Sequence, residues 1–174
     1  MADYSFITHW HIEAPLHPVY DVIFRSLEWP TWWHGAERVD ECAAGDADGI
    51  GSIRRYTWKG RLPYRLTFDA CTTRIEPMAI LEATTSGDLE GMGRWVFSEW
   101  GEITTVRYEW QVRTTKPWMN AIAPLAAFAF RKNHDALMQQ GAEGLALHLN
   151  ARLVAVSHAE APSGLRAVIQ CANR

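Results

Sequence analysis

Hydrophobic and polar residues alternate along several segments of this chain, and the alternation predicts β-strands. Between residues 4 and 13, Phe6 and Trp10 belong to an apolar face, and mostly polar residues occupy the other face, as in a half-buried strand. The same pattern is clearest over residues 103–113. Turn residues separate further runs of this kind, which we expect to be strands at 52–59, 64–76, 80–85 and 93–100. Short turns between sequential strands predict a curved antiparallel sheet of six or seven strands.

Helical spacing of apolar residues appears in three other places. Val19 and Ile23 belong to a short helix that Trp29-Pro30 is expected to end, because the residue before a proline avoids helical backbone angles. Residues 31–35 predict a second short helix with their first residue as the N-cap. The longest helix is expected at 124–151, since proline is favoured in the first turn of a helix.

The long predicted helix carries an apolar stripe on one face. Its members are Phe130, His134, Leu137, Gly141 and Leu145. Gly141 and Gly144 each cost about 1 kcal/mol relative to alanine in a helix interior, so we expect a sheet or a ligand to approach the helix closely there. His134 should face the sheet, where burial would keep it neutral at pH 7 and suit it to packing or to orienting a ligand.

Composition narrows the function classes. The formal net charge is −3 and the basic residues are scattered, so neither nucleic acid nor an anionic membrane is an expected partner. No apolar stretch approaches about 18 residues, and no positive region followed by an apolar core stands at the N-terminus. Cys42, Cys71 and Cys171 are odd in number and far apart. We therefore expect a cytoplasmic protein without a disulfide framework or a membrane span.

The order of elements and five short stretches resemble a known superfamily. A strand, two short helices, a run of antiparallel strands and a long helix follow one another in the helix-grip fold. The stretches are Glu13-Ala14-Pro15, residues 29–33, residues 108–110, residues 116–120 and Asn133-His134-Asp135. With them the chain resembles the START-like superfamily of polyketide cyclase/dehydrase and lipid-transport proteins, which includes pollen allergens and coenzyme Q-binding proteins, and within it a bacterial subgroup.

The resemblance covers residues 4 to 151 and implies an α+β helix-grip fold, in which a curved sheet surrounds the long helix and leaves a cavity between them. It therefore predicts one ligand-binding domain over residues 1–151. Residues 152–174 are expected to be a C-terminal extension, either a tail or a short added element.

Aromatic residues are the candidates for the cavity wall. The chain has nine tryptophans; these fit either a tryptophan-rich core or an aromatic-lined pocket, and their distribution over inward strand positions favours the pocket. The residues expected to contact a ligand are Arg54, Tyr56, Trp58, Leu66, Phe68, Trp95, Tyr108, Trp110, Phe130, His134 and Leu137.

The sequence does not decide two features of this candidate site: which arginine faces the cavity, and the role of residues 32–34. Strand alternation turns either Arg54 or Arg55 toward the cavity, and Arg54 shares its side with Tyr56 and Trp58. A buried arginine needs a partner, which a ligand carboxylate or enolate would supply; the alternative is a strand too near the sheet edge to bury it. Residues 32–34 form either the pocket entrance or a helix cap packed on the sheet edge.

The residues predict non-covalent binding of a small hydrophobic or aromatic molecule. The resemblance implies that this molecule is one such as a lipid, a quinone or a polyketide and that the protein is a carrier or a sensor. His9 and His11 share a strand face pointing away from the core and have no third ligand, so no metal is expected, and no cofactor motif is present. An enzyme is the alternative: a cyclase or dehydratase in which His134 or Tyr108 moves protons. A module that binds another protein is the third possibility. The oligomeric state stays open.

Overall fold

The computed structural model describes residues 3–61, 63–115 and 123–160. Two expectations reach outside these residues: the block at 116–120 and the end of the C-terminal extension. The helices are α1 (Leu16–Phe24), a 3-10 turn η1 (Ser26–Glu28), α2 (Trp29–Trp32) and α4 (Ala123–His148). The strands are β1 (Asp3–Glu13), β2 (Ala36–Ala43), β3 (Ile53–Trp58), β4 (Leu66–Glu76), β5 (Ile80–Gly87), β6 (Leu89–Trp100), β7 (Ile103–Thr114) and β8 (Arg152–Glu160).

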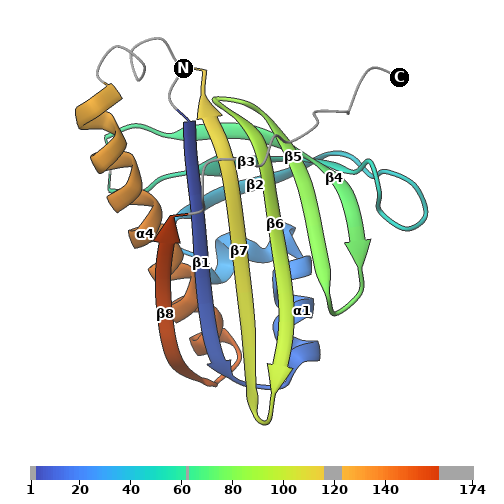
Figure 1. Ribbon diagram of the computed structural model, residues 1–174. Helices are drawn as coiled ribbons and strands as arrows, with labels where there is room; N and C mark the ends of the chain where they lie inside the picture. Colours follow the sequence, from blue (N-terminus) through green and yellow to red (C-terminus); the bar gives the residue numbers. More distant parts are fainter. Residues whose placement is uncertain (1–2, 62, 116–122, 161–174) are drawn as a thin grey trace.

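All eight strands form one antiparallel sheet in the order β2-β3-β4-β5-β6-β7-β1-β8. The sheet is long and strongly curved, and the helices lie together on its concave side (Figure 1). Consecutive strands from β2 to β7 are neighbours, and β7 then pairs with β1, which brings the two ends of the domain together. The α+β helix-grip architecture expected from the order of elements is confirmed.

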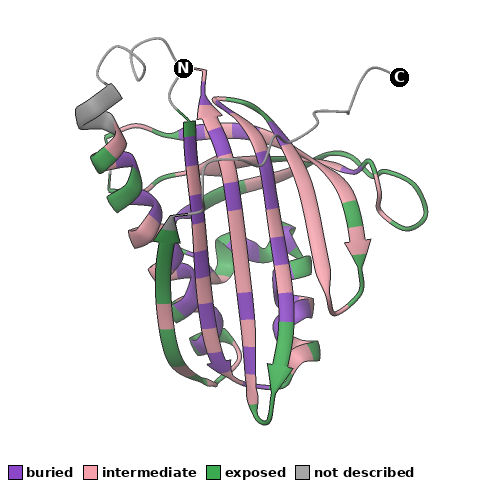
Figure 2. Ribbon diagram, in the orientation of Figure 1, coloured by how far each residue is buried: buried purple, intermediate pink, exposed green. Residues whose placement is uncertain are grey.

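The predicted alternation along the first strand is confirmed. Every second residue of β1 from Tyr4 to Ile12 is buried, and the residues between them are half-buried. Figure 2 shows this as alternating bands along β1 and β7. Side chains of successive strand residues point to opposite faces of the sheet, so one face of these strands packs on the helices.

The strand count of six or seven was too low, because residues 152–160 form β8. This strand pairs with β1 from Glu13↔Arg152 to Phe6↔Glu160. It is an edge strand with mostly exposed side chains, so it lacks the alternation of a half-buried strand. A bulge also leaves Val154 without a direct partner, which shifts the alternation by one residue. Residues 161–174 lie outside the described residues.

The segment between α1 and β2 differs from the expectation at its boundaries. α1 ends at Phe24, before Trp29-Pro30, and α2 begins at Trp29 and not at Thr31. Pro30 stands in the first turn of α2, where the missing backbone N–H has no helical partner to lose. Trp33 then takes an extended conformation and leads into β2.

The long helix ends earlier than expected and is approached closely at its glycines. α4 ends at His148 because Asn150 takes a left-handed conformation, with φ of 50°, a common helix-terminating conformation. A Cβ on Gly141 would lie 2.5 Å from the Trp33 ring, and one on Gly144 would lie 2.1 Å from the Trp32 carbonyl oxygen. The close approach is confirmed, and the approaching element is chiefly the α2 segment.

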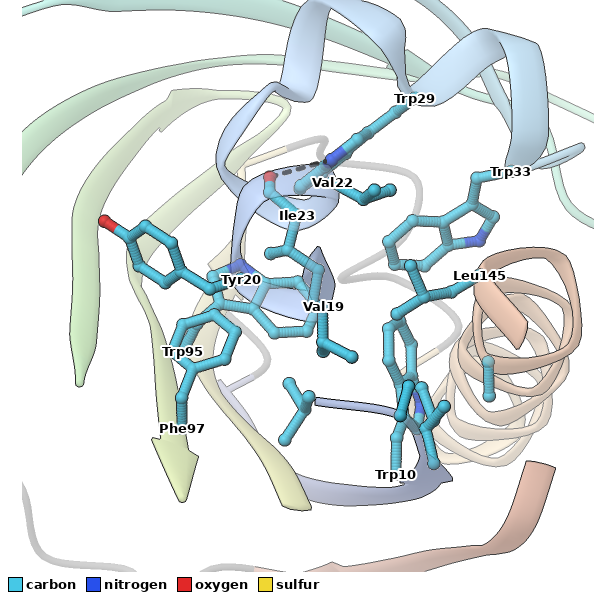
Figure 3. Close-up of a cluster of buried hydrophobic side chains, with 14 of the residues drawn as sticks. Trp10, Val19, Tyr20, Val22, Ile23, Trp29, Trp33, Trp95, Phe97 and Leu145 are labelled. Carbon is cyan, nitrogen blue, oxygen red and sulfur yellow. Dashed lines mark hydrogen bonds between the residues drawn. The ribbon is translucent and has the colours of Figure 1, made fainter. Parts of the chain in front are cut away.

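Indole rings fill the core where α1, α2 and α4 meet the sheet (Figure 3). We call this set the indole cluster; its members are Trp10, Trp29, Trp33, Trp58 and Trp95. The buried indole N–H of Trp29 donates to the carbonyl oxygen of Ile23 at 3.0 Å. The N–H of Trp33 donates to the carbonyl oxygen of Leu137 at 2.8 Å. These two bonds tie the α2 segment to α1 and to α4. No helix in the described part of the chain is long and apolar enough to span a bilayer.

Candidate functional site

A cavity of about 190 Å³ lies between the sheet and the helices. Strands β3 to β7 form its sheet wall, and the α1–η1–α2 segment and α4 cover it. An engineered protein cavity of about 150 Å³ takes up benzene, so this space has room for an aromatic ring. Cavities lined mainly by apolar and aromatic side chains, with a few polar groups, are typical of sites for small molecules.

The cavity exists because small residues take the inward positions of β4, β5 and β6. Ala70 pairs with Thr85 across β4 and β5, and Thr72 pairs with Ala83. Ala83 in turn pairs with Gly93 on β6. These five residues therefore form a continuous patch that borders the cavity, and we call it the small-residue floor. Larger side chains at these positions would fill the space between sheet and helix.

All the residues that the sequence nominated as ligand contacts border the cavity. Arg54, Tyr56 and Trp58 come from β3, Leu66 and Phe68 from β4, Trp95 from β6, Tyr108 and Trp110 from β7, and Phe130, His134 and Leu137 from α4. Whether these residues bind a ligand stays a prediction.

Aromatic rings make up the walls around the floor. Trp95 stacks on Tyr108 with ring centroids 4.1 Å apart, and Tyr56 stacks on Phe68 at 5.8 Å. The Tyr108 hydroxyl lies only 2.8 Å from where a Cβ on Gly93 would be, so the missing side chain makes room for the phenol. Burial raises the pKa values of Tyr56 and Tyr108 above the ordinary value. Both phenols therefore stay protonated at neutral pH and act as hydrogen-bond donors.

Arg54, and not Arg55, is the arginine on the cavity side of β3. Its Nη1 donates to Ser26 Oγ at 2.8 Å and, more weakly, to the carbonyl oxygen of Phe24 at 3.4 Å. The Tyr56 hydroxyl also donates to Ser26 Oγ, at 2.8 Å. Arg55 points to the other face and binds the Asp69 carboxylate with Nε and Nη2, at 2.7 and 2.9 Å. The choice that the sequence left open is thus settled by strand geometry.

His134 lies on the cavity side of α4 and packs between two aromatic rings. Its imidazole stacks on Phe6 at 4.2 Å and on Trp110 at 5.3 Å. Neither ring nitrogen has a hydrogen-bond partner within the described residues, although Nδ1 lies 3.5 Å from the Asp135 carboxylate. Burial lowers the pKa of His134, and the nearby Asp135 partly opposes this. The ring is therefore neutral at pH 7.

Asp135 also links α4 to the edge strand β8. Its Oδ1 lies 3.5 Å from His158 Nδ1, the same separation as from His134. His158 Nδ1 is 3.3 Å from the Thr8 hydroxyl on β1. The Asp135 carboxylate thus stands between a buried imidazole and a more exposed one, and the neighbouring imidazoles lower its pKa.

Sequence reasoning missed the parts of the site that depend on contacts between distant segments. Ser26 lies in η1 and meets β3 only in the folded chain. The small-residue floor had a readable signal, because Ala70, Thr72, Ala83, Thr85 and Gly93 fall at inward positions of consecutive strands. Of residues 32–34, Trp33 is a buried cavity neighbour and His34 is exposed.

Potential metal ligands do not gather in the described part of the chain. Among residues 3–61, 63–115 and 123–160, no group of three or more His, Cys, Asp or Glu side chains is placed to hold an ion. The rings of His9 and His11 stack at 6.4 Å on the face opposite Trp10, and His11 Nδ1 lies 3.0 Å from the Thr105 hydroxyl.

Solved structures of other proteins share this architecture. TTHA0849 from Thermus thermophilus matches with a TM-score of 0.67 and 17% identity, over 83% of this chain and 98% of that one. Zhui aromatase/cyclase from Streptomyces sp. R1128 matches with a TM-score of 0.64 and 12% identity, over 85% and 96%. The ginseng major latex-like protein 151 from Panax ginseng matches with a TM-score of 0.62 and 10% identity, over 84% and 97%. The chain has the helix-grip fold.

These matches show that the chain has the fold that the resemblance implied. Identities this low carry the fold and not the activity. No family model matches the chain, and no curated protein matches it.

Proposed function

We propose that this helix-grip protein binds one small hydrophobic or aromatic molecule non-covalently in its cavity, as a carrier or a sensor. The observation that carries the proposal is the combination of a small-residue floor with aromatic walls. Elsewhere the space between the sheet and the helices is filled by large side chains such as Trp10 and Ile12, both almost fully buried. Close packing is the rule in protein interiors, so an unfilled space bordered by Tyr108, Trp95 and Phe68 is best explained by a guest molecule.

The structural neighbours support the same proposal. One of them is named an aromatase/cyclase and another a major latex-like protein. The mainly apolar and aromatic lining of this cavity favours an apolar or aromatic ligand, and lipids, quinones and polyketides are the classes that we propose.

A binding assay tests the proposal directly. Native mass spectrometry of the purified protein should detect a retained small molecule or, after a panel of fatty acids, sterols, quinones and flavonoids is added, a 1:1 complex. Trp58, Trp95 and Trp110 border the cavity, so binding should also change the intrinsic fluorescence. If no member of the panel changes the mass, the fluorescence or the melting temperature, the proposal is wrong.

A cyclase or dehydratase is the second candidate, and His134 is the observation that favours it. A buried neutral imidazole with unused ring nitrogens can accept a proton, as a general base does. Tyr108 would serve only as a proton donor, because burial raises its pKa. In this reading, His134→Gln keeps ligand binding but abolishes turnover of a polyketide-like substrate. In the binding reading, the same variant keeps binding and no turnover is seen in either protein.

A further inference from the structure

We infer that the molecule held in this cavity is an apolar carboxylic acid whose carboxylate binds to Arg54. The inference rests on the proposed binding function and names the chemical class of its ligand. Its basis is that Arg54, Ser26 and Tyr56 form a polar corner of an otherwise apolar cavity, and that this corner has more hydrogen-bond donors than acceptors.

The donor excess follows from counting hydrogens. Arginine has five N–H groups and no acceptor; the bonds of Arg54 to Ser26 and Phe24 in the described part of the chain both use Nη1. Its Nε is buried without a partner among the described residues. Ser26 and Tyr56 bring two hydroxyl hydrogens, and the bond between them uses one. A buried donor left without an acceptor is unfavourable, and a ligand with two acceptor oxygens would satisfy the donors of this corner.

The free part of Arg54 has the shape that binds a carboxylate. Nε and Nη2 form one edge of the guanidinium group, and this edge makes paired bonds to the two oxygens of a carboxylate. The neighbouring Arg55 uses that same edge to bind Asp69. On Arg54 the Nε of this edge has no partner among the described residues but is covered by protein atoms. A second carboxylate would therefore approach from the Nη2 end and pair with both nitrogens after a small shift of the side chain.

The charge of Arg54 also lacks a carboxylate partner in the part of the chain that the structure describes. Nine described arginines have a carboxylate oxygen within 4.0 Å, namely Arg25, Arg38, Arg55, Arg65, Arg74, Arg94, Arg107, Arg113 and Arg152. Arg54 has none within the described residues, although it is only partly exposed to water. A guanidinium that is partly withdrawn from water favours an anionic partner. Tyr56 shares Ser26 with Arg54 and packs against Trp29 and Phe68, so the partner's apolar body would pack on aromatic rings.

A matched pair of probes tests this. Naphthalene-2-carboxylate and naphthalene-2-carboxamide have nearly the same shape and differ in charge, and their binding to the full chain can be followed by calorimetry and tryptophan fluorescence. The wild-type protein should bind the carboxylate at least about tenfold more tightly, as expected for charge-assisted paired bonds. Equal affinity for the two probes, or tighter binding of the amide, would overturn the inference.

Two arginine variants test whether Arg54 causes the preference for the carboxylate probe. Arg54→Met should lower the affinity for the carboxylate by roughly 10- to 100-fold and change that for the amide by less than about threefold. Arg55→Met removes the adjacent arginine, which points away from the cavity, and should leave both affinities unchanged. If Arg54→Met weakens both probes equally, or Arg55→Met weakens the carboxylate as much, the inference fails. If Arg54→Met does not fold, the wild-type comparison of the two probes still decides.

Failure of the proposed binding function can be distinguished from failure of the inference about a carboxylic acid. If neither probe binds and the wider panel is also inactive, the cavity is not a binding site and both proposals fall. If the amide and other neutral molecules bind while the carboxylate does not, the binding function stands and the inference about the acid is overturned.

Discussion

Filling the cavity should stabilise the protein and abolish binding. Ala83 stands at the centre of the small-residue floor, paired with Thr72 on one side and Gly93 on the other. In the Ala83→Leu variant, three additional carbon atoms enter the space that Ala83 now borders. If the space serves a ligand, the substitution should separate stability from function, as substitutions that fill functional cavities do.

The magnitude follows from the surface that the new side chain buries. Three buried carbon atoms contribute about 2.4 kcal/mol at about 0.8 kcal/mol each. Fixing a leucine side chain costs about 0.5–1 kcal/mol of conformational entropy, so the free energy of unfolding should rise by about 1.5 kcal/mol. For a chain of 174 residues, this corresponds to an increase of about 3–6 °C in melting temperature.

Thermal unfolding and probe binding check the two halves of this prediction. Ala83→Leu should melt at a higher temperature than the wild type and bind cavity ligands at least about tenfold more weakly, because the ligand and the leucine compete for the same volume. Thr84→Leu is the matched control, since Thr84 is the next residue of β5 and is absent from the cavity lining. A destabilised Ala83→Leu protein that still binds its ligand normally would refute the reasoning.

Two further predictions concern α4. Gly141→Ala gains about 1 kcal/mol of helix propensity, but its Cβ would lie 2.5 Å from the buried Trp33 ring. Because overpacking costs about 1–3 kcal/mol, the melting temperature should fall by a few degrees. A higher melting temperature than that of the wild type would contradict the packing argument. Burial lowers the pKa of His134 in the folded protein, so the unfolded chain binds more protons and stability falls as the pH drops below about 6.5. Denaturant titrations between pH 5 and 8 should show that the free energy of unfolding depends less on pH in His134→Phe, whose ring keeps the stacking, than in the wild type or in His34→Gln. An equal pH dependence in all three proteins would contradict the assignment of this effect to His134.

Much of the fold could be predicted because its strands are half-buried. β1 alternates strictly and β7 alternates except at the half-buried Tyr108, so their boundaries and inward residues are readable from the sequence. β8 was missed because an exposed edge strand with a bulge at Val154 carries no such pattern. The early end of α4 depends on the left-handed backbone of Asn150, a conformation that asparagine adopts readily but that the apolar spacing does not record.

The site was predictable where it depends on which way a strand residue points. Alternation along β7 selected Tyr108, and alternation along β3 left Arg54 or Arg55 as the inward arginine; Tyr108 and Arg54 border the cavity. It could not show that Ser26 would reach Arg54, because the two residues are 28 positions apart and meet only when η1 packs on β3. The small residues that keep the cavity open could be read as inward positions of three strands, but only the pairing of these strands shows that they form one patch.

The indole cluster gives the protein an optical property. Neighbouring rings in it are separated by only 4.9 Å between Trp33 and Trp58, 5.2 Å between Trp29 and Trp33, and 5.4 Å between Trp10 and Trp95. At such separations the electronic transitions of the indoles couple, and excitation passes from ring to ring. The near-ultraviolet circular dichroism should therefore be unusually strong, and it should vanish as soon as fixed packing is lost, even where helices and strands persist. Since Trp33, Trp58 and Trp95 also border the cavity, a guest that contacts one ring would alter the spectrum of the whole group.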